Sequence, residues 1–149
     1  MALVASLSAC GGDSGADAGS IATYDLAVQE VIASMTADTF AAVPAGSTPG
    51  REAISTVVEA RRRAAEALEA LSPPAEMEPE HLVLVEALRR LVSGGEAFLA
   101  DTESLDPEAF VAALETSTEV DALARAVAAA CSAWEDRSEN LGIAVELAC

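Results

Sequence analysis

The stretch TPGREAISTVVEARRRAAEALEALSPP, residues 48–74, decides the fold of this chain because it has the pattern of one helix enclosed by prolines. We expect Thr48 to be the N-cap and Pro49 the first helical residue, the positions where these residue types are favoured. Ser72-Pro73-Pro74 ends the helix, since proline cannot continue one. Apolar residues recur at helical spacing between these ends and indicate one buried face. They are Ile54, Val57, Val58, Ala64, Ala65, Leu68 and Leu71.

The other prolines also fall between apolar-periodic segments and separate further helices. The pattern predicts helices over residues 20–43, about 79–100, and 106–141. Asp106-Pro107-Glu108 is a strong helix start, because it combines a cap, a proline and an acidic first turn. Gly142 is a natural residue after a helix end.

The last of these segments is about 35 residues long, roughly 52 Å of helix, and would overhang the others. We expect a break near Thr116-Ser117-Thr118, where three hydroxyl side chains compete for backbone hydrogen bonds. Alanine-rich composition, with 52% hydrophobic but only 3% aromatic residues, also favours helices. The predicted fold is therefore all-α, an antiparallel four-helix bundle whose last helix is broken.

The segment Leu7-Ser8-Ala9-Cys10, followed by Gly11-Gly12, resembles a bacterial lipobox. With the tether and the closing segment from Cys131 to Cys149, it makes the chain similar to small, mostly helical bacterial lipoproteins. The resemblance implies lipidation of Cys10 and anchoring on the extracytoplasmic side of a membrane, periplasmic or at the cell surface. It implies no particular activity.

Three domains of the chain follow from this interpretation. Residues 1–9 are a truncated signal segment, because they are short and hold no Arg or Lys. Residues 10–19 are the lipidated cysteine and a flexible Gly/Ser/Asp tether, and residues 20–149 are the helical domain. The alternative is an N-terminus with an incidental cysteine.

Lipidation of Cys10 would leave Cys131 and Cys149 as one pair, and disulfides persist in exported proteins. The segment from Ile143 to Cys149 alternates apolar with small or polar residues, which indicates an extended return. Seven extended residues reach about 23 Å, whereas Cys131 lies roughly 16 Å of helix below Gly142. We therefore expect an extended C-terminal tail tied back by a Cys131–Cys149 disulfide.

The net charge of −17 repels nucleic acid, whose binding requires cationic side chains, and disfavours adsorption to anionic lipid. The chain has one His, one Tyr, one Trp and no Lys, and it lacks nucleophile-elbow, phosphate-loop and Cys-x-x-Cys motifs. We expect no enzyme, no catalytic residue and no cofactor.

Glu78 and His81 have the Glu-x-x-His spacing of di-iron bundles, but in a single copy and at a helix start. We expect an acidic first turn with an exposed histidine there rather than a metal site. Weak cation binding by Glu76, Glu78 and Glu80 with His81, or by Asp101, Glu103 and Asp106, is the alternative to a solvated acidic surface.

Arg61-Arg62-Arg63 and Arg89-Arg90 are the only basic clusters. They would form an anion pocket if their helices were neighbours, but ordinary pairing of Arg62 with Glu66 and of Glu86 with Arg90 is favoured. Gly94-Gly95 allow a close crossing, a kink or a break, and mark the place for a ligand cavity or hinge. Trp134 lies one turn beyond Cys131 and is expected to pack in the core.

These observations predict a non-enzymatic binding or interaction module at the cell envelope, offering a helical face or groove to a protein partner. The alternative is a carrier for a small ligand or cation, using the core near Gly94-Gly95 or the acidic loops. A protein partner favours an exposed apolar patch, whereas a carrier requires a defined pocket.

Overall fold

The computed structural model describes residues 18–147 and 149, and this part of the chain is all-helical, as predicted. It contains no strand within the described ranges. No helix there is both long enough and apolar enough to cross a membrane. The helices are α1 (Ala18–Ala42), α2 (Arg51–Glu69), α3 (Glu78–Asp101), α4 (Pro107–Glu115) and α5 (Thr118–Asn140).

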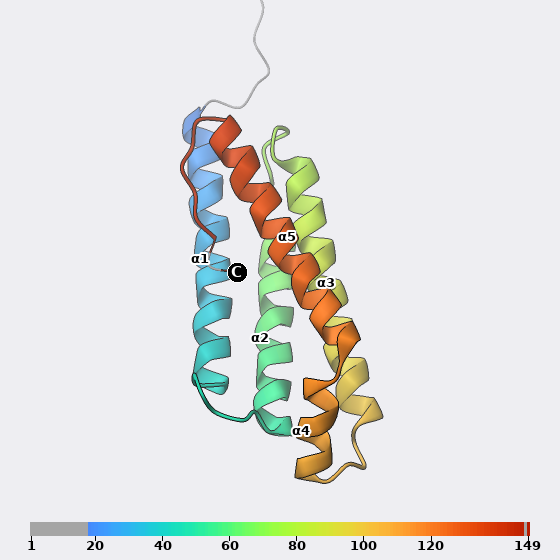
Figure 1. The fold of residues 1–149 in the computed structure, drawn as a ribbon. Coiled ribbons are helices and arrows are strands. Elements are labelled where there is room, and N and C mark those ends of the chain that lie inside the picture. The colour runs from blue at the N-terminus through green and yellow to red at the C-terminus, as the bar shows by residue number, and fades with distance from the viewer. Residues whose placement is uncertain (1–17, 148) are drawn as a thin grey trace, which may run out of the picture.

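The four long helices lie side by side, and successive ones run in opposite directions (Figure 1). The close neighbours are α1 with α2, α2 with α3, and α3 with α5. The short helix α4 lies at the end of the molecule where α3 ends and α5 begins. Helices α1 and α5 are not a closely packed pair, so they form the two edges of this curved row.

Local capping sets the ends of the last helices where the sequence predicted them. The Asp106 carboxylate accepts a hydrogen bond from the Ala109 amide at 2.9 Å, and α4 begins at Pro107. Ser117 caps α5 in the same way, which confirms the break near residues 116–118. Gly142 follows the end of α5 with a φ of +79°, a left-handed conformation that glycine adopts at little cost.

The predicted start of α2 is wrong by two residues. Gly50, not Thr48, is the N-cap, and no side chain caps the helix. Tertiary contacts decide this start: the Arg51 guanidinium donates to the Leu99 carbonyl at 2.9 Å and lies 4.6 Å from the ring centre of Phe110. The first turn of α2 is thereby tied to the ends of α3 and α4. Helix α1 also begins earlier than predicted, inside the expected tether.

The core combines small and large apolar side chains, with Trp134 and Phe110 the largest that are fully buried. Phe40 and Leu82 belong to the apolar stripes of α1 and α3 but are exposed, with 63% and 58% of their surface accessible. Their apolar stripes are wider than the faces that neighbouring helices cover, so the outermost positions of each stripe face solvent. The buried apolar residues of α2 are Val57, Val58, Ala60, Ala64, Ala65 and Leu68.

The C-terminal tail runs back from the end of α5 between α5 and α1, and stops near the middle of the molecule (Figure 1). Ile143, Val145 and Leu147 alternate toward the core, as an extended segment requires. The sulfur atoms of Cys149 and Cys131 are at bonding distance, with their Cα atoms 6.5 Å apart, as predicted. A disulfide that closes a loop of this length adds about 3 kcal/mol to the free energy of unfolding.

Candidate functional site

The only histidine, tyrosine and tryptophan of the chain meet in the core, between α1, α3 and α5. The Tyr24 hydroxyl lies 2.6 Å from Nδ1 of His81, and the Tyr24 and Trp134 rings are 5.6 Å apart. All three side chains are buried. The expectation of an exposed His81 is therefore wrong, because position 81 shares the inward face of α3 with Leu84 and Leu88.

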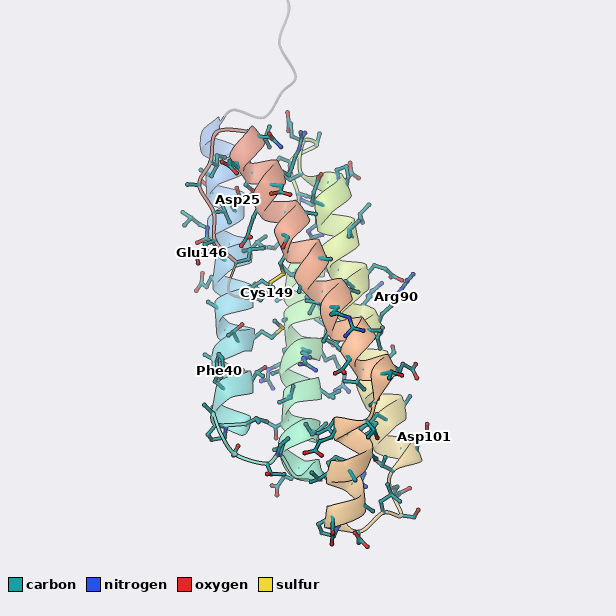
Figure 2. All side chains as sticks on the ribbon, in the orientation of Figure 1. Asp25, Phe40, Arg90, Asp101, Glu146 and Cys149 are labelled. Atoms are coloured by element: carbon teal, nitrogen blue, oxygen red, sulfur yellow. A yellow bond between two sulfur atoms is a disulfide. The ribbon has the colours of Figure 1, made fainter. Side chains whose placement is uncertain are left out.

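Asp25 is buried beside this group, with 1% of its surface accessible (Figure 2). Its Oδ1 accepts hydrogen bonds from Nε1 of Trp134 at 2.9 Å and from the Ser138 hydroxyl at 3.3 Å. Its Oδ2 has no partner among the described residues. Burial raises the pKa of Asp25 against the lowering effect of these two hydrogen bonds.

Burial also lowers the pKa of His81, and it raises the pKa of Tyr24 well above its usual range. Both shifts favour the uncharged side chains, as expected in a closed interior. Tyr24, Asp25, His81, Trp134 and Ser138 are each less than a tenth accessible, so this cluster offers no surface to a substrate. We interpret it as a polar tie between three helices.

The candidate metal ligands do not come together. Glu78 is exposed in the first turn of α3, whereas His81 faces the core and contacts Tyr24. Over residues 18–147 and 149, no group of three or more His, Cys, Asp or Glu side chains is arranged to hold a metal ion.

Arg62 and Arg89 of the two basic clusters line one cavity, but Glu66 and Glu69 line it too, so it is no anion pocket. One predicted pairing is also wrong. Arg62 contacts Glu59 on its own helix and Glu96 on α3, not Glu66, because α3 packs directly beside this part of α2. Arg90 pairs with Glu86 at 2.7 Å, as predicted. The remaining pairs in these clusters are Arg63 with Asp38 and Arg89 with Glu69.

Gly94 and Gly95 lie within one continuous α3, at two close crossings. A Cβ at Gly95 would meet Cγ2 of Val58 on α2 at 2.6 Å, and one at Gly94 would collide with the Leu123 side chain on α5. Of the close crossing, kink or break that the sequence left open, the structure contains the close crossing.

An apolar groove of 580 Å³ is lined by residues of α1, α5 and the end of the tail, together with residues of α2 and α3. Cys149 lies at its upper end, and Phe40 lies farther down on α1 (Figure 2). We call this the α1–α5 groove. It is lined by Met35, Thr36, Thr39, Phe40, Arg61, Leu88, Leu91, Ala124, Val127, Ala128, Leu147 and Cys149.

Arg61 of α2 lines this groove and also a second apolar cavity of 230 Å³. Thr39 lines both as well, so the two spaces adjoin. The second cavity also includes Gly95, which places one of the predicted ligand-region glycines at its wall. Burial lowers the pKa of Arg61, the only charged side chain in the groove lining.

No protein-family model, curated protein or solved structure matches this chain. The lipobox residues Leu7 to Cys10 lie outside the described residues, and the lipidation of Cys10 stays a prediction.

The sequence analysis missed Asp25 and named Arg61 only as part of a basic cluster, although each residue carries a signal of its own. Asp25 falls between Ile21 and Val28 at helical spacing, and Arg61 follows Val57 by four residues. Each is thus a charged residue in register with an apolar stripe. Such a residue can form hydrogen bonds inside the core, as one carboxylate oxygen of Asp25 does. It can also line a groove that opens from the core, as Arg61 does.

Proposed function

We propose that this chain is a non-enzymatic binding module that takes a small apolar or amphiphilic ligand into the α1–α5 groove. The observation that carries the proposal is the groove itself. Its volume of 580 Å³ falls within the roughly 300–1,000 Å³ of ligand pockets, and its walls are predominantly apolar.

The distribution of chemically versatile side chains supports binding rather than catalysis. An active site needs titratable groups that meet around a substrate. The groove lining contains one charged side chain, Arg61, and no carboxylate or histidine side chain. His81, Tyr24 and Asp25 are buried elsewhere, in the cluster between α1, α3 and α5.

The proposal also includes the arrangement of the helices and the location of the domain. The four long helices act as one antiparallel bundle, with the tail filling the upper part of the gap between its edge helices. Cys10 carries lipid and holds the domain on the extracytoplasmic side of a bacterial membrane. The lipobox residues and the disulfide-forming cysteine pair support this location.

A protein partner is the second candidate, and exposed apolar side chains favour it. Leu26 on α1 is 64% accessible, while Leu82 and Val83 on α3 are 58% and 55% accessible. Exposed apolar side chains that gather in a patch mark interaction surfaces. The groove differs from these positions because it is concave and lined by four helices and the tail, which suits a small ligand better.

The test uses N-phenylnaphthylamine, an uncharged apolar dye that fluoresces strongly in apolar sites. We expect saturable fluorescence enhancement with the full chain. Ala124→Trp, an exposed α5 position in the groove lining, should fill the groove and weaken dye binding at least tenfold. Ala129→Trp is the matched control, because Ala129 is also exposed on α5 and does not line the groove.

An equal loss of dye binding in Ala124→Trp and Ala129→Trp would contradict the proposed function. The absence of saturable dye binding to the parent chain would contradict it as well. Loss of dye binding on substitution of Leu82 and Val83, with Ala124→Trp unaffected, would move the site to the exposed surface.

A further inference from the structure

Arg61 differs from the other arginines of this chain because it is half-buried and has no polar partner among the described residues. Arg62, Arg63, Arg89 and Arg90 pair with carboxylates. Arg51 and Arg137 donate to backbone carbonyls, and Arg125 is exposed. Arg61 is half-buried, and no hydrogen bond or ion pair joins it to any described residue.

A desolvated cation without a partner is unfavourable, because nothing replaces the water removed from it. The chain has 25 acidic residues, yet none of those described pairs with this guanidinium. An anion supplied from outside would compensate the charge. The fork of guanidinium donors matches the two oxygens of a carboxylate.

The apolar surroundings of Arg61 indicate what the remaining part of such an anionic ligand must be. Apolar walls extend from it on both sides, with Met35, Leu91 and Val127 in the groove and Val57, Phe98 and Leu114 in the smaller cavity. A small hydrophilic anion would leave these walls uncovered. A ligand that satisfies both features has one negative head and one apolar chain.

We propose that the α1–α5 groove binds a single-chain fatty acid, with its carboxylate on Arg61 and its alkyl chain along the apolar walls. This inference rests on the proposed function and names its ligand class. One cation matches one carboxylate, whereas a polyanionic ligand would meet the field of a chain with a net charge of −17. Thr39, which lines both cavities beside Arg61, can add a hydroxyl donor.

The experiment measures displacement of bound N-phenylnaphthylamine from the full chain by three single-chain ligands that have the same twelve-carbon chain length and differ in the head. These are laurate and dodecyltrimethylammonium, each below its micellar concentration, and dodecanol below its solubility limit. Vesicles of phosphatidylglycerol are a fourth competitor. We expect laurate to bind at least tenfold tighter than dodecanol, because a charged hydrogen bond contributes about a factor of ten or more.

The variants Arg61→Gln and Arg61→Lys assign that preference to the guanidinium. Arg61→Gln should lose the laurate advantage over dodecanol when both ligands are measured on that variant, and Arg61→Lys should keep part of this advantage. Arg90→Gln is the matched control, since Arg90 is exposed and paired with Glu86 outside the groove. It should behave as the parent chain does.

The outcomes separate the two proposals. Dye binding without a laurate preference, or a laurate preference that survives in Arg61→Gln, overturns the fatty-acid inference and leaves the groove as an apolar site. Displacement by phosphatidylglycerol vesicles but not by laurate also overturns it. Absence of dye binding overturns the proposed function itself. The comparison of laurate with dodecanol on the parent chain needs no variant to fold.

Discussion

Asp25 is a carboxyl group buried in the apolar core with incomplete hydrogen bonding. One of its carboxylate oxygens is held by Trp134 and Ser138, while the other has no partner among the described residues. Burial of a carboxyl group with incomplete hydrogen bonding favours its protonated form, which is the direction of its pKa shift. The folded state therefore binds a proton at Asp25 more tightly than the unfolded chain does.

This difference predicts a pH dependence of stability. From about pH 3.9, the ordinary pKa of aspartate, up to the raised pKa, the folded protein should lose stability as pH rises. One proton sets the slope at no more than about 1.4 kcal/mol per pH unit. Asp25→Asn keeps an oxygen acceptor and cannot ionise, so it should gain stability relative to the parent chain over the same window.

Urea unfolding of both proteins between about pH 4 and pH 8 measures this difference. His81 has the opposite effect, because its pKa is lowered and stability is lost as pH falls below about 6.5. The difference between the parent and Asp25→Asn cancels that contribution, since both contain His81. A difference that stays constant with pH would contradict the account of Asp25.

At the scale of the helix, local chemistry could be predicted and tertiary contacts could not. Asp106, Ser117 and Gly142 mark helix ends through their own side chains or backbone freedom, so the sequence was sufficient there. The start of α2 was missed because Arg51 is fixed by α3 and α4. The width of each buried face also depends on the neighbouring helices, which is why Phe40 is exposed although it lies in the apolar stripe of α1.

The two glycines of α3 allow a second test at this scale. Gly95→Ala should destabilise the protein by about 1–3 kcal/mol, because the new methyl group meets the stiff, buried side chain of Val58. The gain in helix propensity, about 1 kcal/mol, offsets only part of this cost. Urea unfolding provides the measurement.

Gly94→Ala is the internal comparison. Its methyl group meets the end of the flexible, partly exposed Leu123 side chain, which can move aside. We expect this variant to be close to the parent in stability. If Gly95→Ala were as stable as Gly94→Ala, the α2–α3 crossing would not require a glycine.

Over the whole molecule, the decisive feature is that α1 and α5 meet at one end, where Tyr24 and Asp25 contact Trp134, and are not closely packed along the rest of their length. The tail covers one part of the gap between α1 and α5 and leaves the groove below it. Sequence periodicity identifies which helices exist and which residues are apolar, but it does not show which edges fail to meet. The groove and the role of Arg61 could therefore not be derived from the sequence, although the return of the tail could.

The most direct measurement of the central claim is amide proton–nitrogen correlation NMR of the full chain during titration with laurate. We predict that chemical shift changes concentrate on the groove lining, at Thr36, Thr39, Arg61, Ala124 and Ala128. Amides near the exposed Leu26, Leu82 and Val83 should change little. Changes centred on those exposed residues, or no saturable change at all, would contradict the account of the groove as the ligand site.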